Sequence, residues 1–173
     1  MKLTWFGGTA LRVYAGGQIV VIDPDSAPAA VDRGELLSGA DRIVMAGDAL
    51  PQIDAARWRA KAMPRVTEET PPAEVGRLDG ALLVAAAGEA PLVVLGAGAL
   101  PRFGRWADGA VIVLTQARDD LIAEVTALLD VARPRLIALA VDEAALDRAI
   151  EALAEHLDGA GLSSLEPGLA LEV

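Results

Sequence analysis

The chain has 173 residues, 53% of them hydrophobic but only 3% aromatic, and its 25 acidic and 15 basic residues give a formal net charge of −10. This length suits one domain, residues 1–173, with an aliphatic core. The acidic balance argues against a nucleic-acid-binding protein, because phosphate neutralisation needs clustered Lys and Arg. Cysteine is absent, which excludes disulfides, thiolate zinc sites and cysteine nucleophiles.

The first third of the chain is dense in short strand-like runs. Residues 2–6, 10–14 and 18–23 are separated by Gly-rich turns and predict a meander of antiparallel hairpins. Residues 42–46, "RIVMA", predict a buried strand. Residues 51–62 then predict a helix with Pro51 in its first turn, where proline fits.

The middle of the chain predicts four strands, at residues 65–69, 73–78, 81–86 and 91–96. The last two make an apolar stretch long enough to suggest a membrane span, but Glu89, Pro91 and several glycines interrupt it. Two strands around a turn are the better interpretation. The N-terminus has no apolar signal region, and we expect a cytoplasmic protein with no membrane partner.

The last third alternates strands with helices. Residues 110–115 and 135–141 predict buried strands, and residues 119–132 and 143–159 predict amphipathic helices. The predicted apolar stripes are Leu121, Val125, Leu128 and Ala132 on the first helix, and Leu146, Ile150, Leu153 and Leu157 on the second. A strand, a turn and a strand close the chain. Antiparallel strands followed by this alternation indicate two sheets packed face to face with helices outside.

Both ends of the chain carry motifs in a characteristic order. The opening is "MKLTWFGGTALRVYAGGQIVVIDP", the later part contains "ADGAVIVLTQARDDLIAEVTALLDVARPRLIALAV", and the end is "LSSLEPGLALEV". In this order and spacing they resemble the metallo-β-lactamase-fold hydrolases of the UlaG-like branch. The resemblance implies a four-layer αββα sandwich, shortened and without large active-site insertions, and descent from metal-dependent hydrolases.

The resemblance also implies metal ligands at defined positions, and this sequence has other residues there. The histidine after the first glycine is replaced by Gly8, the bridging aspartate by Ala97 and the last histidine by Val141. The family's His-x-His-x-Asp-His run, which follows the strand at 42–46, falls on Gly47, Asp48, Ala49, Leu50, Pro51 and Gln52. We interpret this loop as a metal-binding loop from which the ligands have been lost.

The residue types point the same way without the resemblance. A catalytic zinc needs about three nitrogen, sulfur or oxygen ligands from the protein. The chain has one histidine, His156, so carboxylates alone would have to hold the metal, and such sites suit Mg²⁺, Ca²⁺ or Mn²⁺ better. His156 lies near the end of the last predicted helix, where the helix dipole favours an imidazole, and we interpret it as structural.

Three aspartates are candidates for a remaining polar rim. Asp23 ends the third strand, Asp48 lies in the emptied loop, and Asp142 follows Val141. We expect them to rim a depression whose floor is aliphatic, with no cofactor, no ordered metal and no loss of stability in Asp48→Ala. The alternative is that they are solvated loop acids of an acidic protein.

Two further segments have more than one interpretation. Residues 96–104, "GAGALPRFG", begin like a dinucleotide-binding loop, but Pro101 stands where the third glycine is needed, so a Gly-rich turn is favoured. Residues 102–106, "RFGRW", are either an exposed binding or dimer patch or a segment packed on the surface. Trp5 and Phe6 alternate on a strand, so they are expected to face different layers.

These observations predict a non-catalytic homologue of metal-dependent hydrolases that is retained as a binding or assembly module. Two-fold dimers are the commonest closed assembly, so we expect a homodimer. The alternative function is a hydrolase with a carboxylate-only metal site near Asp23, Asp48 and Asp142.

Overall fold

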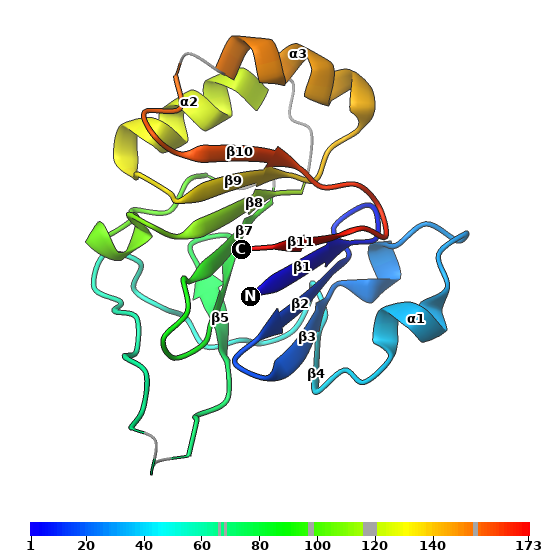
Figure 1. Ribbon diagram of the computed structural model, residues 1–173, viewed down its shortest axis with the longest axis vertical. Coiled ribbons are helices and arrows are strands. Elements are labelled where there is room, and N and C mark those ends of the chain that lie inside the picture. The colour runs from blue at the N-terminus through cyan, green and yellow to red at the C-terminus, as the bar shows by residue number, and fades with distance from the viewer. Residues whose placement is uncertain (66, 68, 97–98, 116–120, 154–155) are drawn as a thin grey trace.

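The computed structural model describes residues 1–65, 67, 69–96, 99–115, 121–153 and 156–173. Within this part of the chain the strands form two sheets that lie face to face (Figure 1). Sheet A has the strand order β11 (Ala170–Glu172), β1 (Lys2–Trp5), β2 (Leu11–Ala15), β3 (Gln18–Ile22) and β4 (Arg42–Val44). Sheet B has the order β10 (Gly161–Ser164), β9 (Leu136–Leu139), β8 (Val111–Leu114), β7 (Leu92–Leu95), β6 (Ala81–Ala85) and β5 (Glu74–Leu78).

The predicted N-terminal meander is confirmed in sheet A. Strands β1, β2 and β3 pair antiparallel in sequence order, β4 joins β3 in parallel, and β11 returns from the far end of the chain to pair with β1. The strand expected at residues 42–46 is shorter than predicted, and of its three residues only Val44 is buried. Ile43 is 47% exposed, because β4 is the edge strand of sheet A.

Sheet B combines two hairpins with a parallel block. Strands β5, β6 and β7 pair antiparallel, which confirms the two strands around a turn, and β7, β8, β9 and β10 pair in parallel. In the described part of the chain, no helix is long and apolar enough to cross a membrane. The strand predicted at residues 65–69 falls partly outside the described residues, and residues 65, 67 and 69 are not in a strand.

Side chains alternate between the two faces of each strand and so form three apolar layers. The layer between the sheets contains Leu3, Trp5 and Val13 of sheet A against Val84, Val94 and Val113 of sheet B. The outer face of sheet B packs against the C-terminal helices, and the outer face of sheet A packs against a short helix. Trp5 lies in the inter-sheet layer and Phe6 in the outer one, as predicted.

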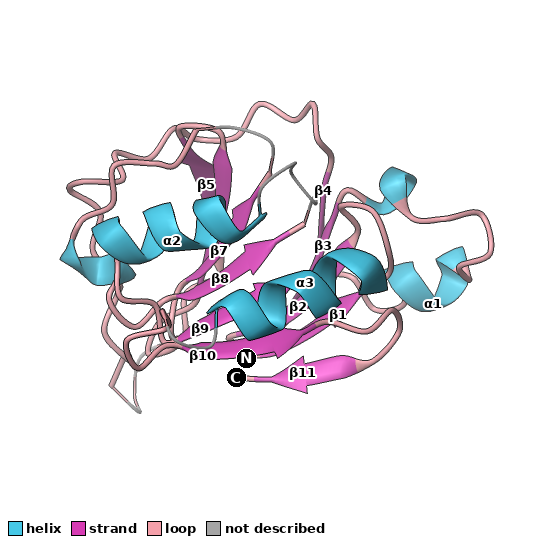
Figure 2. Ribbon diagram, turned by 90° about the horizontal axis from the view of Figure 1, so that it is seen from above, coloured by secondary structure: helices cyan, strands magenta, loops and turns pink. Residues whose placement is uncertain are grey.

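The helices cover the two outer surfaces of the sandwich, and α2 and α3 lie together over sheet B (Figure 2). The helical segments are η1 (Pro24–Ser26), α1 (Arg33–Leu37), η2 (Arg105–Ala107), α2 (Leu121–Val131) and α3 (Glu143–Leu153). The arrangement is therefore the predicted αββα sandwich. The residues before Leu121, where the helix was expected to begin, lie outside the described residues.

The apolar stripe of α2 is buried as predicted, and that of α3 is buried in part. In α3 Leu153 of the predicted stripe is buried together with Ala145 and Ala149, Leu146 is partly buried against the same cluster, and Ile150 is 45% exposed. The buried face thus keeps Leu153 and turns toward the two alanines. The small alanines let the helix lie close against sheet B and α2, which leaves the larger Ile150 at the surface.

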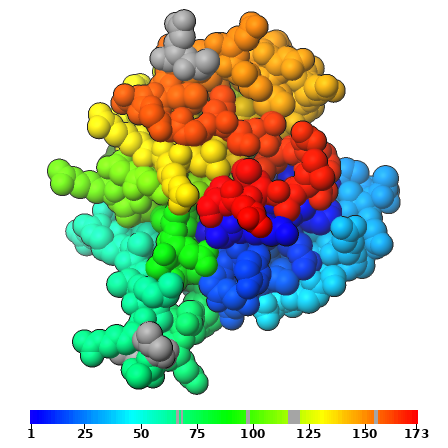
Figure 3. All heavy atoms as spheres, viewed as in Figure 1, coloured from blue at the N-terminus to red at the C-terminus, as the bar shows by residue number. Residues whose placement is uncertain are grey.

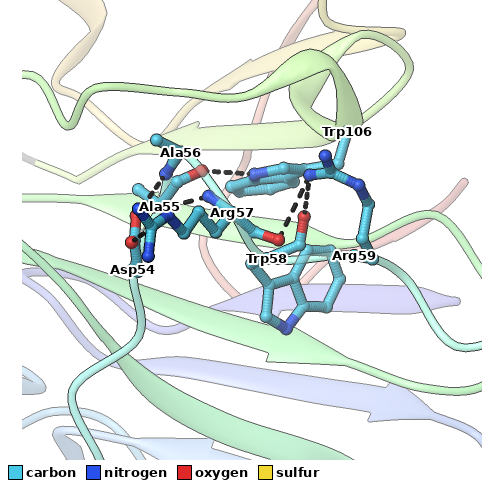
Figure 4. A network of polar contacts seen from close by, with 7 residues as sticks. All are labelled: Asp54, Ala55, Ala56, Arg57, Trp58, Arg59 and Trp106. Atoms are coloured by element: carbon cyan, nitrogen blue, oxygen red, sulfur yellow. Dashed lines mark hydrogen bonds and ion pairs between the residues drawn. The ribbon is translucent and has the colours of Figure 1, made fainter.

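The prediction of a helix at residues 51–62 is wrong. The backbone of residues 51–53 instead pairs with the exposed edge of β5: Arg77 N donates to Pro51 O at 2.9 Å, and Ile53 N donates to Arg77 O at 2.8 Å. The Asp54 carboxylate then accepts from the backbone N–H groups of Ala56 and Arg57, which closes a turn (Figure 4). Sheet pairing and this turn replace the hydrogen bonds that a helix would have made.

The chain leaves this turn as a long exposed excursion before it returns at Glu74. Its described residues between 61 and 72 form the protrusion at the bottom of Figure 3. The excursion is anchored where Gly88 N donates to Lys61 O at 3.1 Å, and Met63, although 68% exposed, lies against Gly88.

Candidate functional site

A cavity of about 260 Å³ opens between the two sheets at one end of the sandwich. Strands β3 and β4 of sheet A and strands β7 and β8 of sheet B all have their carboxyl ends there. In α/β proteins the loops beyond the carboxyl ends of parallel strands are the usual place for a ligand. Its lining residues are Thr9, Ile22, Asp23, Val44, Met45, Ala46, Arg77, Gly80, Leu82, Val94, Gly96 and Thr115.

The floor of the cavity is aliphatic because it is formed by the last inward-facing row of each sheet. In sheet A, Ile22 is the register partner of Val44, and in sheet B, Leu82 is the register partner of Val94. The four side chains belong to the inter-sheet layer. The floor is therefore aliphatic, but it is built from strand residues. The sequence placed Gly8, Gly47, Ala49, Ala97 and Val141 there, and the described members of that set do not line the cavity.

Asp23 lines the cavity from the sheet A side. Its backbone is in the left-handed region, with φ 44°, and its N–H donates to Val44 O at 2.7 Å, which ties the end of β3 to β4. The Thr9 hydroxyl donates to Asp23 Oδ2. The carboxylate is thus held by Thr9 of the β1–β2 loop, and the backbone of Asp23 by Val44 of β4.

Arg77 lines the cavity from the sheet B side. Residue 75, two positions earlier on β5, is a valine that packs in the inter-sheet layer, and the period of two places Arg77 on the same inward face. Arg77 Nη2 donates to Ala46 O at 2.6 Å across the cavity mouth. This bond joins the edge of sheet B to the loop after β4.

Thr115 is a buried polar residue, 4% exposed, directly after β8. Its hydroxyl donates to Leu95 O at 3.2 Å, and its side chain lines the cavity beside Gly96. From the part of the chain that the structure describes, the cavity therefore has one carboxylate, one guanidinium and two threonine hydroxyls over an aliphatic floor.

The predicted rim is only partly assembled, since Asp23 lines the cavity and Asp48 and Asp142 do not. Asp48 Oδ2 accepts from Met45 N at 2.9 Å within its own exposed loop. Asp142 Oδ1 accepts from Ala145 N at 2.8 Å and caps the start of α3. Both carboxylates accept hydrogen bonds from backbone N–H groups within three residues, and this local role explains why an aspartate follows each strand.

The loop expected to have lost its ligands runs along the outside of the molecule. Gly47, Ala49, Pro51 and Gln52 are exposed, and Gln52 forms the β-bridge to Arg77. None of these residues lines the cavity, although Met45 and Ala46, just before them, do. That the loop once held a metal stays a prediction.

The remaining substituted positions are spread over the same end of the strands. Gly8 lies in the turn between β1 and β2 with φ 56°, and its carbonyl accepts from Trp5 Nε1 at 3.0 Å. Val141 is 8% exposed and packs in the layer under α2 and α3, not in the cavity. Ala97 lies outside the described residues.

The described residues do not fit the zinc centre that the fold family implies. Among them, no group of three or more His, Asp or Glu side chains is placed to hold a metal. His156 is exposed, follows α3, and its Nδ1 contacts Ala152 O at 3.0 Å. This ring contact is with the backbone one turn earlier, and the structural role of His156 stays a prediction.

The "RFGRW" segment packs against the rest of the protein, and its aromatic rings do not form an exposed patch. Trp106 is buried, and its Nε1 donates to Ala55 O at 2.6 Å (Figure 4). Phe103 and Trp58 contact the Trp106 ring edge to face, with centroids 5.8 and 4.8 Å away. Residues 97 and 98 of the Gly-rich stretch lie outside the described residues.

The sequence interpretation missed Arg77, Thr9 and Thr115. The signal for Arg77 was present, because in "EVGRL" it shares a strand face with Val75, where an apolar residue is expected. Thr115 was visible as the first polar residue after the apolar run of β8. Neither is a residue type that a search for metal ligands selects.

The fold is similar to that of two solved structures. One, from Thermotoga maritima, is described as a Zn-dependent hydrolase of the metallo-β-lactamase superfamily; it is 12% identical, the match covers 96% of this chain and 99% of that one, and the TM-score is 0.51. The other is Igni18, a metallo hydrolase from Ignicoccus hospitalis, 13% identical over 99% of this chain and 98% of that one, with a TM-score of 0.49. No protein-family model and no curated protein sequence matches the chain.

At these levels of identity the likeness establishes the fold alone. The chain has the metallo-β-lactamase-like fold, and the architecture expected from the sequence is confirmed. The UlaG-like branch stays a prediction.

Proposed function

We propose that this chain is a non-catalytic homologue of metal-dependent hydrolases and acts as a binding module, with the cavity between the sheets as its ligand site. The observation that carries the proposal is the lining of that cavity, a few convergent polar groups over an aliphatic floor. Concave, mostly apolar sites with a few well-placed polar groups are the usual form of a small-molecule site.

The non-catalytic part of the proposal is supported by the residue types at the expected ligand positions. Gly47, Pro51 and Val141 have no metal-binding side chain, and the sequence has a single histidine and no cysteine. Zinc activates water only when about three protein ligands hold it. Asp48 and Asp142, which could have replaced lost ligands, are engaged with backbone amides.

The non-catalytic part is tested by elemental analysis of the purified protein. We expect less than one equivalent of zinc, iron or manganese per chain, removable by EDTA. A stoichiometric metal that survives EDTA would overturn this part and favour the alternative of a metal-dependent hydrolase.

The ligand site is tested by a matched pair of variants in one loop. Ala46 and Ala49 are both exposed, but only Ala46 lines the cavity. We expect a panel of small carboxylic acids, amines, sugars and nucleosides to contain compounds that shift the amide resonances of Gly80 and Gly96, both lining residues. Ala46→Phe should abolish these shifts and Ala49→Phe should preserve them. Equal effects of the two variants, or no shift with any compound, would contradict the proposal.

A further inference from the structure

We propose that the cavity binds a small zwitterion of the amino-acid class, with its carboxylate on Arg77 and its ammonium group on Asp23; this inference rests on the ligand site proposed above. The two charged residues lie on opposite sheets and, among the described residues, are the charged members of the cavity lining. The lining is therefore divided into a cationic and an anionic side, with aliphatic surface between them.

The cationic side is a guanidinium with free donors. Arg77 Nη2 is held by Ala46 O, and among the described contacts this is the only hydrogen bond or ion pair of the side chain. The bond restrains the guanidinium and uses one of the two Nη2 hydrogens, so the second Nη2 hydrogen remains available together with Nε or Nη1. An arginine fixed in this way is suited to a carboxylate, because the planar fork can donate two parallel hydrogen bonds.

The anionic side offers acceptors from Asp23 and Thr9, and Thr115 adds one from the sheet B side of the cavity. Asp23 Oδ2 already accepts from the Thr9 hydroxyl, and Oδ1 has no hydrogen bond among the described residues. The Thr9 and Thr115 hydroxyls each donate to a protein oxygen, so their lone pairs are free to accept. Asp23 is therefore the charged acceptor for an ammonium group, and the hydroxyls of the lining are further acceptors for its three N–H donors.

The opposite charges of the lining select against simpler ligands. A plain carboxylate of the same size would place its charge on Arg77 but leave the charge of Asp23 without a cation. A plain amine would satisfy Asp23 but leave the charge of the Arg77 guanidinium without an anion. A ligand that has both groups satisfies both sides, and charge-assisted hydrogen bonds are stronger than neutral ones.

The volume and the floor of the cavity limit the size of the ligand's side chain, which is its third group beside the carboxylate and the ammonium. The cavity holds about 260 Å³, which is below the volume of about 300–1,000 Å³ typical of sites for drug-sized ligands. Its floor is formed by Ile22, Val44, Leu82 and Val94. A short branched aliphatic group fits such a floor, so L-leucine is the natural probe.

The experiment compares three ligands that differ by one charged group each. L-Leucine, 4-methylpentanoate, which lacks the amine, and 3-methylbutylamine, which lacks the carboxylate, are titrated into the protein while the amide resonances of Gly80 and Gly96 are followed. We expect L-leucine to bind at least about tenfold more tightly than either analogue.

Two variants assign each charge to its residue. Asp23→Asn keeps the shape, and asparagine tolerates the left-handed backbone of this position. It should reduce leucine affinity to that of 4-methylpentanoate, and Asp25→Asn, at an exposed neighbour outside the lining, should not. Arg77→Gln should reduce leucine affinity to that of 3-methylbutylamine, and Arg42→Gln on the exposed edge of β4 should not.

The outcomes separate this inference from the ligand site itself. If 4-methylpentanoate or 3-methylbutylamine binds as tightly as leucine, the zwitterion is wrong while the ligand site stands. If none of the three shifts Gly80 or Gly96 but another compound of the panel does, the ligand class is wrong. The comparison uses the unmodified protein, so it decides the inference even where a variant fails to fold.

Discussion

Trp58 and Trp106 meet edge to face with their ring planes at 72°, and this contact joins the turn after Asp54 to the segment before β8. Trp106 Nε1 also donates to Ala55 O, and the same oxygen accepts a hydrogen bond from Gly104 N at 3.0 Å. Two loops that are far apart in the sequence are thereby locked together beside the edge strand β5.

We expect Trp106→Phe to lower the free energy of unfolding by about 1–2 kcal/mol, because a buried hydrogen bond and part of the buried ring are lost. Trp58→Phe is the matched control, since its ring is only partly buried and donates no hydrogen bond among the described contacts. Urea denaturation measures both. Equal losses in the two variants would show that the Trp106–Ala55 bond contributes nothing.

Gly8 and Gly47 both occupy positions where the resemblance implies histidine, but they differ in their surroundings. A Cβ at Gly8 would lie 2.5 Å from Ser26 O with φ 56°, whereas a Cβ at Gly47 would have nothing within 4 Å. We expect Gly8→Ala to destabilise the fold by about 1–3 kcal/mol and Gly47→Ala to change it by less than about 0.5 kcal/mol. Thermal unfolding that ranks the two in the opposite order would refute this.

Asp142 is expected to stabilise α3 as its N-cap. Asp142→Ala should cost about 1 kcal/mol, because Ala145 N loses its side-chain acceptor. Asp147, exposed within the same helix, is the control, and Asp147→Ala should be close to neutral. Circular dichroism during denaturation gives both values. A neutral Asp142→Ala would remove the capping role and return this residue to the candidates for a polar rim.

Hard cations should bind weakly or not at all at the cavity. Ca²⁺ prefers about six to eight oxygen ligands, and Asp23 is the one carboxylate among the lining residues that the structure describes. Calorimetry with Ca²⁺ or Mg²⁺ should show no micromolar binding. Asp48→Ala should cost at most about 0.5 kcal/mol, since its bond to Met45 N is solvent-exposed. Micromolar binding that disappears in Asp48→Ala would favour a carboxylate metal site.

We further expect the protein to be a homodimer, because closed two-fold assemblies are the commonest and a non-catalytic module is most simply retained for a contact. Multi-angle light scattering at micromolar concentration should give twice the mass of 17.9 kDa. A mass of one chain would contradict the dimer and leave a different partner as the explanation.

The sandwich could be predicted from the sequence because its signals are local. Strand residues such as Leu11 and Val13 alternate with polar neighbours at a period of two, and α2 has its stripe at helical spacing. The prediction of a helix at residues 51–62 failed because Pro51 also suits the start of a helix. The segment pairs instead with the edge of β5, which is formed by residues later in the chain. Tertiary pairing outweighed local propensity there.

The cavity could be predicted only in part. Its polar groups come from several strands, and the register between strands cannot be predicted from neighbouring residues in the sequence. Asp23 was found because it ends a strand next to a proline. Arg77 was overlooked because it points inward only if Val75, on the same face of β5, packs between the sheets. Which face of β5 packs there depends on the tertiary structure. Asp48 and Asp142 were overvalued, because an aspartate after a strand serves equally well as a turn or cap residue.

The pairing of β11 with β1 has a consequence for how the chain reaches its native state. Sheet A is completed only when residues 170–172 dock beside residues 2–4, and the same C-terminal segment has just placed β10 in sheet B. Contacts between residues far apart in the sequence carry a high loop-closure entropy cost, and folds dominated by them fold slowly. On the ribosome, β1 therefore keeps one edge unpaired until residues 170–172 have been made, and an exposed strand edge is the feature that favours pairing with other chains.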